Sequence, residues 1–356
     1  MGVSMRIKSK DIAKALGIST ATVSLVINNK PGVNAMTRKK VFDYIKEKEY
    51  EEFGIERKET ELKKGIIVMF HYYKHGIILS RSKEITSKPV QRMESIAIQA
   101  GYRMRVIHYH EKYDKLDSIL EELKKEGVQG LYIMGAEMNE SDIFPFTRLK
   151  VPIVVGDNNF IEQGYDSFLI DNQEGIQRAV DYLIYKGHSH IAYLAEDIDI
   201  FNFLERREAF IREMAVRECG NARNQIWYLG NTIDTVYDSI SKYLSSEGRL
   251  PTAFVLESSI ISLGVSKALM ERSLRVPRDI SLIGFDALPE DSVLGFELTL
   301  IRGTHSRRHI AAIKHLIRHI EEKEVETIRI YYKTRLMEGN SVFDKAKYNY
   351  TKPRGI

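Results

Sequence analysis

Apolar positions recur at helical spacing in residues 1–48 and predict three short helices. They span about 10–16, 20–28 and 38–48, and the residues able to cap them are Ser9, Ser19 and Thr37. The side chains expected to face one another are Ile12, Ala13, Ala15, Leu16, Val23, Val26, Ile27, Val41, Tyr44 and Ile45. These residues predict a small all-α unit around one short apolar core.

From Gly65 the pattern changes to apolar runs that alternate with helical periods. Strands are predicted at 65–70, 103–108, 128–134, 151–157, 167–171, 190–195, 224–229, 252–257, 280–286 and 328–334. Helices are predicted at 90–100, 115–125, 174–186, 202–217, 234–246, 260–273 and 304–322. Several strands are continuous apolar runs, typical of parallel strands buried on both faces. The alternation predicts doubly wound parallel sheets, and the length predicts two stacked subdomains.

The expected domains follow from these changes of pattern. A head (1–48) precedes a mostly charged linker (49–64), a core (65–345) and a tail (346–356). Within the core we expect an N-subdomain of about 65–163 plus 300–325 and a C-subdomain of about 164–299 plus 326–345. Open α/β sheets bind ligands beyond the carboxyl ends of their strands, so the cleft between subdomains is the expected ligand site.

Charge separates the head from the rest of the chain. Residues 1–48 hold ten Lys or Arg and three acidic residues, a net +7, so the remaining residues sum to −3 within the total of +4. A basic head on a near-neutral body predicts a polyanionic partner for the head, although a solvated helical surface has the same composition. The single cysteine, Cys219, excludes an intrachain disulfide and a cysteine-based zinc site. We find no signal-peptide pattern and no apolar run near ~20 residues, so we expect a cytoplasmic protein that does not cross a membrane.

The first two helices predict a helix-turn-helix. They meet at Gly17, where glycine permits a left-handed turn. The second helix then presents small hydroxyl side chains that can meet phosphates when it lies in a major groove. The alternative is a three-helix bundle with no role in binding DNA.

The head resembles the lac repressor (LacI/GalR) family through DIAKALGISTATVSLVINNKPGVNAMTRKKVFDYIKEKEY. Further blocks follow in the family order, among them VPIVVGDNNF, ERREAFIREM, VPRDISLIGFDALP and LTLIRGTHSRRHIAAIKHLIRHI. The resemblance implies a repressor with an N-terminal helix-turn-helix and a periplasmic-binding-protein-like core. It implies base contacts from Thr20, Ala21 and Leu25, and backbone contacts from Ser19, Thr22, Ser24, Asn28, Asn34 and Thr37. The family usually has Arg at Leu25, and leucine cannot make the bidentate contact that reads guanine.

The linker departs from the family pattern of a hinge helix that places a leucine in the minor groove. Tyr50 is followed by Glu-Glu-Phe-Gly-Ile-Glu without proline, and residues 49–61 hold six glutamates, which phosphates repel. The candidate wedge residues are Phe53, Ile55 and Leu62. The alternative is a linker that stays unordered on DNA.

Two carboxylates and a guanidinium are expected at the cleft. Asp157 and Asp286 each close an apolar strand, and Arg206 follows the strand that ends at Ala195. Carboxylates accept from hydroxyl groups and arginine donates to them, so these residues suit a hydroxyl-rich ligand. The resemblance extends the effector contacts to Asn202 and Ser258. The alternatives for each residue are a helix N-cap or an interdomain ion pair.

The effector is expected to be a carbohydrate, either a sugar or a glycoside. Glu257-Ser258-Ser259 stands where the family has Ala-Asn-Asp, and Thr232 stands where the family has an aromatic residue. His71 and Tyr72 after the first strand are expected to supply stacking in its place. These departures point away from a common monosaccharide or a purine.

Two histidine pairs have the spacing of a metal site on a helix, namely His305 with His309 and His315 with His319. Arg307, Arg308, Lys314 and Arg318 lie in the same helix and oppose a cation. We therefore interpret the segment as a solvated helix face and predict no metal.

We expect a homodimer that binds pseudo-palindromic operator DNA and a small-molecule effector. The sequence leaves induction and co-repression open. A solute-binding protein of the same core fold without a DNA role is the alternative. An enzyme would need a phosphate-binding loop or a nucleophile with a base, and we find neither, so no cofactor is expected.

Overall fold

The computed structural model describes residues 9–27, 33, 37, 40, 41, 44, 64–75, 88–220, 222–245, 250–289, 292–303, 305–322 and 326–345. The chain divides into two units, Met1–Leu62 and Lys63–Ile356, which we call the head and the core. Their boundary falls within the expected linker. Asn28, Asn34, the wedge candidates and the tail 346–356 lie outside the described residues.

The head contains the expected pair of helices, α1 (Ser9–Leu16) and α2 (Thr20–Ile27). Gly17 between them has φ of +64°, the left-handed conformation that glycine adopts without steric cost. The N–H of Ile18 donates to the carbonyl of Ala13 at 3.0 Å and closes the turn. The buried core consists of Ile12, Ala13, Val23, Val26 and Val41. Ala15, which the helical spacing also placed inward, is exposed.

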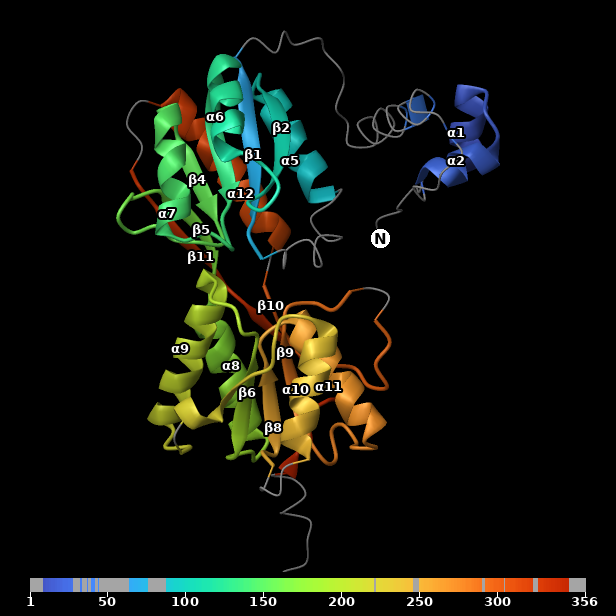
Figure 1. Cartoon of the computed structure of the whole chain (residues 1–356), viewed down its shortest axis with the longest axis vertical. Helices are drawn as coiled ribbons and strands as arrows, with labels where there is room; N and C mark the ends of the chain where they lie inside the picture. Colours follow the sequence, from blue (N-terminus) through green and yellow to red (C-terminus); the bar gives the residue numbers. More distant parts are fainter. Residues whose placement is uncertain are drawn as a thin grey trace, which may run out of the picture. The chain divides into compact units, whose positions relative to one another are not determined.

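The core consists of two six-stranded sheets, each covered by helices on both faces (Figure 1). The first sheet has the order β11-β5-β4-β3-β1-β2, and all its strands are parallel. Its strands are β1 (Ile66–Tyr73), β2 (Arg103–His110), β3 (Val128–Met134), β4 (Ile153–Gly156), β5 (Asp166–Ile170) and β11 (Arg329–Tyr332). Its helices are α5 (Lys88–Gln99), α6 (Leu116–Lys125), α7 (Glu140–Ile143), the 3-10 helix η1 (Phe144–Leu149) and α12 (His305–Glu321).

The second sheet has the order β12-β10-β9-β8-β6-β7, and only β12 runs antiparallel to its neighbour. Its strands are β6 (Ile191–Ala195), β7 (Ile226–Tyr228), β8 (Ala253–Leu256), β9 (Ser281–Phe285), β10 (Thr299–Arg302) and β12 (Arg335–Met337). Its helices are α8 (Asn172–Tyr185), α9 (Phe201–Val216), the 3-10 helix η2 (Ala222–Gln225), α10 (Ile233–Leu244) and α11 (Ser259–Glu271).

Alternating residues of β1 show how each sheet is buried on both faces. Ile67 and Met69 pack with apolar residues of α5 and α12, whereas Val68 and Phe70 pack with residues of α6. This alternation follows from the period of two residues in a strand. It explains why the parallel strands appear in the sequence as continuous apolar runs.

We call each sheet with its helices one half of the core. The expected subdomain boundaries are wrong at each point where the chain passes between these halves. β5 and β11 belong to the first sheet, although 164–170 and 326–334 were assigned to the C-subdomain. β10 belongs to the second sheet, although it was not predicted as a strand and most of it was assigned to the N-subdomain. An apolar run predicts a strand but not the sheet that it joins, because pairing depends on residues distant in sequence.

Among the described residues, no helix has both the length and the apolar character that a membrane span requires.

Gly175 lies where α8 approaches β9 and β10. A Cβ atom there would lie 2.7 Å from the Phe285 ring and 3.1 Å from a methyl group of Ile301. We predict that Gly175→Ala lowers the free energy of unfolding by about 1–3 kcal/mol, because overpacking outweighs the better helix propensity of alanine. Urea denaturation measures this change. Gln177→Ala on the exposed side of the same helix is the control, and equal stability of the two variants would contradict the prediction.

Candidate DNA-binding face and effector site

The side of α2 expected to face DNA is open to solvent. Ser19, Thr20, Ala21 and Ser24 are exposed, while Thr22 and Leu25 are partly buried. The hydroxyl of Ser19 accepts from the N–H of Thr22 at 3.0 Å, so Ser19 caps the helix as predicted. Thr37 is helical and partly buried. The described part of the head therefore presents a short helix with small polar side chains on its free face.

Two aspartates turn sharply away from the ends of their strands in the core. Asp157 follows β4 with φ of +64°, and Asp286 follows β9 with φ of +67°. Each N–H donates to the neighbouring strand, Asp157 to the carbonyl of Phe168 at 3.2 Å and Asp286 to that of Ile301 at 2.9 Å. Aspartate tolerates this left-handed conformation better than most residues, and such strain is concentrated at functional sites. The two sheets thus present a carboxylate in the same way.

Each carboxylate pairs with an arginine of its own half. Asp157 lies 2.6 Å from one terminal nitrogen of Arg308 on α12 and accepts from the other at 2.7 Å. Asp286 accepts from both terminal nitrogens of Arg206 on α9, each at 3.3 Å. Arg308 is 1% exposed and Arg206 is 2% exposed, so both pairs are shielded from water. Buried charge of this kind is retained only when it is paired.

Two asparagines join the pairs into one network across the halves. The amide of Asn202, on α9, donates to Asp157 at 3.4 Å. Asn172, at the start of α8, donates to the carbonyl oxygen of the Asn202 amide at 2.9 Å and accepts from Arg206 Nε at 2.8 Å. The carboxyl ends of both sheets therefore meet at these residues. We call this set the polar network, and its members are Asp157, Arg308, Asn202, Asn172, Arg206 and Asp286. Four of the predicted effector residues belong to this network, namely Asp157, Asn202, Arg206 and Asp286.

Arg206 is also held by an aromatic ring. Its guanidinium lies 3.6 Å from the centroid of the Phe285 ring, and its terminal nitrogen donates to the carbonyl of Glu257 at 2.8 Å. Stacking and multiple hydrogen bonds fix the orientation of a planar guanidinium. The position of Arg206 is thus set before any ligand binds.

Ser258 has a capping role in the structure. It is the N-cap of α11, its hydroxyl accepts from the N–H of Ile261 at 3.3 Å, and it donates to the buried carboxylate of Glu196. The adjacent Glu257 is fully buried and binds Arg207 at 2.8 Å. The N-cap alternative therefore describes Ser258, and its effector contact stays a prediction.

His71 and Tyr72 lie on opposite faces of β1. Tyr72 packs in the apolar core beside Tyr109, with ring centroids 5.0 Å apart, away from the polar network. His71 is buried, and its Nδ1 lies 3.4 Å from the hydroxyl of Tyr73. Burial, and then the neighbouring His108, lower the pKa of His71 to about 3, so its imidazole is neutral at physiological pH. Both effector contacts stay predictions.

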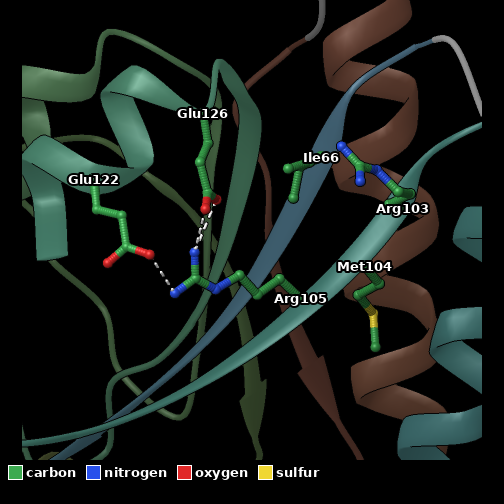
Figure 2. A pocket seen from close by; sticks show the side chains of 6 residues that line it. All are labelled: Ile66, Arg103, Met104, Arg105, Glu122 and Glu126. Atoms are coloured by element: carbon green, nitrogen blue, oxygen red, sulfur yellow. Dashed lines mark hydrogen bonds and ion pairs between the residues drawn. The ribbon is translucent and has the colours of Figure 1, made fainter.

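A separate hollow lies at the start of β1 and β2, the opposite ends of the strands (Figure 2). Its volume is about 380 Å³, and its lining residues are Ile66, Arg103, Met104, Arg105, Glu122 and Glu126. Arg105 binds both oxygens of Glu126 at 2.8 Å and reaches Glu122 at 3.0 Å. These charges satisfy one another at the surface, which favours the polar network as the ligand site.

Comparison with known proteins identifies the family. Residues 9–52 match the description bacterial regulatory proteins, lacI family, and residues 180–342 match periplasmic binding protein-like domain. The HTH-type transcriptional repressor PurR of Pasteurella multocida (strain Pm70) is 30% identical over 322 residues, 89% of this chain and 93% of the repressor. The chain belongs to the lacI family of bacterial regulatory proteins. PurR of Histophilus somni (strain 2336) is 29% identical over 329 residues, 90% of this chain and 95% of that repressor.

Solved structures of lacI-family regulators share the fold. The regulator CelR in complex with cellobiose is 20% identical, with 94% of this chain and 100% of that chain covered and a TM-score of 0.65. The lac repressor dimer bound to operator and the anti-inducer ONPF is 21% identical, with 96% and 100% covered and a TM-score of 0.63. The predicted recognition, fold class and function are confirmed: the chain is a DNA-binding transcriptional regulator with an effector-binding core. The solute-binding alternative has no support.

The sequence interpretation of this lacI-family member missed Arg308 and Asn172. Arg308 was assigned to a solvated helix face, which is wrong, because α12 buries it together with His309 and His315. The helical period contained the signal, since Arg308 precedes the buried Ala312 and Leu316 by four and eight residues. Asn172 had no signal of its own, because asparagine is common at the start of a helix.

We predict that Arg308→Met lowers the free energy of unfolding by about 3–5 kcal/mol, because it leaves the Asp157 carboxylate buried without its partner. Adding Asp157→Asn should recover part of the loss, and a double-mutant cycle in urea measures the coupling between the two residues. Arg307→Met, at the exposed neighbouring position, is the control. A loss below about 1 kcal/mol, typical of an exposed ion pair, would argue against a buried pair.

Proposed function

We propose that this regulator binds operator DNA through α2 and changes its operator affinity when a hydroxyl-rich small molecule binds the polar network of the core. The observation that carries the proposal is the meeting of two Asp–Arg pairs at the carboxyl ends of both sheets, bridged by Asn202 and Asn172. Ligands of open α/β sheets bind at this edge.

The chemistry of the network suits exchange with ligand hydroxyls. Carboxylate oxygens of Asp157 and Asp286 accept from hydroxyl groups, and the guanidinium of Arg206 donates to them. The Asn202–Asp157 contact of 3.4 Å is the longest bond of the network, and it joins the two halves. A ligand hydroxyl that replaces this contact would exchange one hydrogen bond for two, with little net cost in unsatisfied polar groups.

A carbohydrate, either a sugar or a glycoside, is the ligand class that we propose. The groups that meet here are planar amides, carboxylates and guanidinium groups, which recognise hydroxyls by direction. The face of the Phe285 ring that meets the network is covered by Arg206, so we propose that recognition depends on hydrogen bonds more than on stacking. The fold neighbour CelR was solved with cellobiose.

On the DNA side, we propose that two copies pair and bind the two halves of a pseudo-palindromic operator in the cytoplasm. One head presents a single eight-residue helix to a groove, and two heads at a fixed spacing double the contacts. The fold neighbour solved on operator is a dimer. Thr20, Ala21 and Leu25 are proposed to face bases, while the surrounding hydroxyl groups contact phosphates.

Coupling between the two sites is a shift in population. A ligand that contacts both halves stabilises the arrangement of the halves in which it can make both sets of contacts. Operator DNA likewise binds one arrangement more tightly than the other. The effector then changes operator affinity only by its difference in affinity for the two arrangements.

We predict that Arg206→Ala lowers stability, because Asp286 loses its partner, and abolishes the change in operator affinity caused by an effector. Where circular dichroism shows the variant to be folded, its operator binding without effector should stay within about threefold of wild type. An effector is first identified by a thermal-shift screen of sugars and glycosides, and fluorescence anisotropy of a labelled operator then measures affinity. Arg212→Ala, on the exposed side of the same helix α9, should respond as wild type does. A full response in Arg206→Ala would remove this residue from the site.

We also predict that Thr20→Glu weakens operator binding at least ~10-fold, because it places a carboxylate on the exposed face of α2 that meets phosphates. Gln177→Glu makes the same charge change in the core and should leave the affinity unchanged. Binding curves at several salt concentrations show whether the loss is electrostatic. Equal affinities of the two variants would exclude α2 from the interface.

A further inference from the structure

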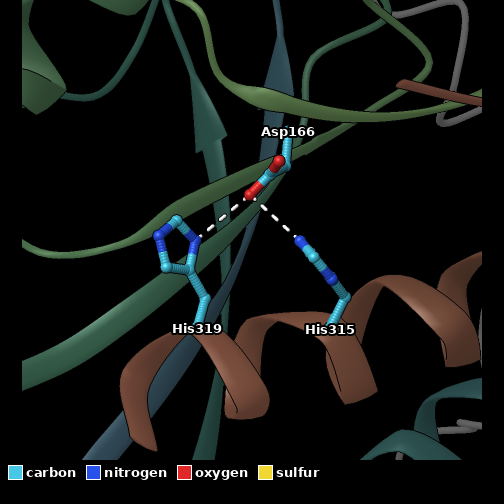
Figure 3. A group of neighbouring side chains, drawn as sticks. All are labelled: Asp166, His315 and His319. Atoms are coloured by element: carbon cyan, nitrogen blue, oxygen red, sulfur yellow. Dashed lines mark ion pairs between the residues drawn. The ribbon is translucent and has the colours of Figure 1, made fainter. Parts of the chain in front are cut away.

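A second cluster of polar side chains lies at the other end of the first sheet (Figure 3). Asp166 begins β5, and His315 and His319 lie one turn apart on α12. One carboxylate oxygen of Asp166 lies 3.1 Å from Nε2 of His315 and 3.1 Å from Nδ1 of His319. One potential ligand atom from each residue lies within 4.8 Å of the others. The pair of histidines seen in the sequence on one helix is thus joined by a carboxylate from a strand.

The cluster is built into the interior of the core. The side chain of Asp166 is 1% exposed and that of His315 is 8% exposed, whereas His319 is 31% exposed and opens the cluster toward solvent. The second oxygen of Asp166 accepts from the N–H of Ile328 at 2.6 Å, and His315 packs against Phe168. These contacts orient the carboxylate and one imidazole, as outer partners do in metal sites.

We propose that Asp166, His315 and His319 bind a divalent first-row transition metal, with Zn²⁺ as the favoured ion. Two histidines at i and i+4 on one helix face, with one carboxylate, form a recurring donor set for such ions. In a tetrahedral zinc site with bonds of about 2.0–2.2 Å, ligand atoms lie roughly 3.3 Å apart. The carboxylate–imidazole distances of 3.1 Å are close to that value. Three protein ligands leave a fourth position for water.

The three side chains bring their ligand atoms close together. Nε2 of His315 and Nδ1 of His319 are both buried, and each lies 3.1 Å from the same oxygen of Asp166. The three ligand atoms, one from each residue, lie within 4.8 Å of one another, as the ligands of one metal ion do.

Of the four cations that led us to predict no metal, two are paired elsewhere, and the other two, Arg307 and Lys314, are exposed. Arg308 binds Asp157 at the far end of α12, and Arg318 binds Glu322 at 2.9 Å. The electrostatic argument from the sequence counted these charges as if they faced the histidines. Their pairing leaves the cluster with one carboxylate as the ligand charge.

The position of the cluster gives the metal a consequence for the core. β5 runs from Asp166 toward Asn172, and α12 runs from Arg308 to His319, so both elements connect this cluster to the polar network. At the end that carries the cluster, α12 is tied by Glu321 to Lys64, at 2.5 Å, where the described part of the core begins. A bound ion would fix α12 against β5 and stabilise the first half. This inference is independent of the proposed effector and operator.

The test uses the full-length protein without a histidine tag, stripped with a chelator and dialysed at about pH 7.5. In isothermal titration, wild type should bind one equivalent of Zn²⁺ per chain, whereas His319→Ala and Asp166→Asn should lose this binding. Co²⁺ should give the visible absorption bands of a tetrahedral site in wild type alone. His190→Ala removes a histidine outside the cluster and should bind as wild type does. Circular dichroism establishes that each variant is folded.

Thermal denaturation provides a second measurement. Zn²⁺ should raise the melting temperature of wild type and His190→Ala, because it binds the folded state, and should not raise that of His319→Ala. Because the side chain of His319 is 31% exposed, we expect His319→Ala to disturb folding less than Asp166→Asn does. Absence of Zn²⁺ binding in wild type, as an Asp–His ion pair alone would give, overturns the proposal. Equal binding by wild type, His319→Ala and Asp166→Asn also overturns it, because the ion would then bind elsewhere.

Discussion

Buried charge at the carboxyl ends of the two sheets constrains the rest of the core. An ionised carboxylate without a partner costs several kcal/mol in a low-dielectric interior, so Asp157 requires Arg308 and Asp286 requires Arg206. These two requirements fix the first turns of α12 and α9 against their sheets. They also account for the left-handed backbone at both aspartates, because that conformation turns each carboxylate toward its arginine. The polar network therefore stabilises the folded core whether or not a ligand is bound.

A site that satisfies its own polar groups differs from an open pocket in how it recognises a ligand. Both aspartates and both asparagines already have partners, so a ligand that binds them gains affinity only where its hydroxyls bond better than those partners do. Asn202 and Asp157 are the partners that belong to different halves, and their contact is the longest in the network. Selectivity and the change in arrangement then arise from the same exchange of hydrogen bonds.

The sequence predicted most elements of the fold but less of their association. The period of apolar residues placed both head helices and nearly all the long helices and strands, while β10, α7 and β12 were not predicted. The positions of Arg206 and Asp286 after apolar strands, together with the resemblance to the family, led to these two residues, because both signals are local in sequence. Arg308 and the Asp166–His315–His319 cluster were misjudged, because their partners are about 150 residues distant and arginine and histidine are common on solvated helices. His71 and Tyr72 were expected to follow the first strand, yet β1 continues to Tyr73, and alternation along the strand sends the two side chains to opposite faces.

The passage of the chain between halves has a consequence for protein synthesis. The first sheet is completed by β11 (Arg329–Tyr332), and one of its faces is covered by α12 (His305–Glu321). Until these late segments leave the ribosome, Ile67, Met69 and Val154 have no apolar cover from α12. In the described part of the head, the buried residues lie between Ile12 and Val41, so they come from one short stretch of the sequence. Much of this face of the first sheet therefore stays uncovered by α12 for most of the synthesis of the chain, and transiently exposed apolar surface of this kind is prone to aggregation.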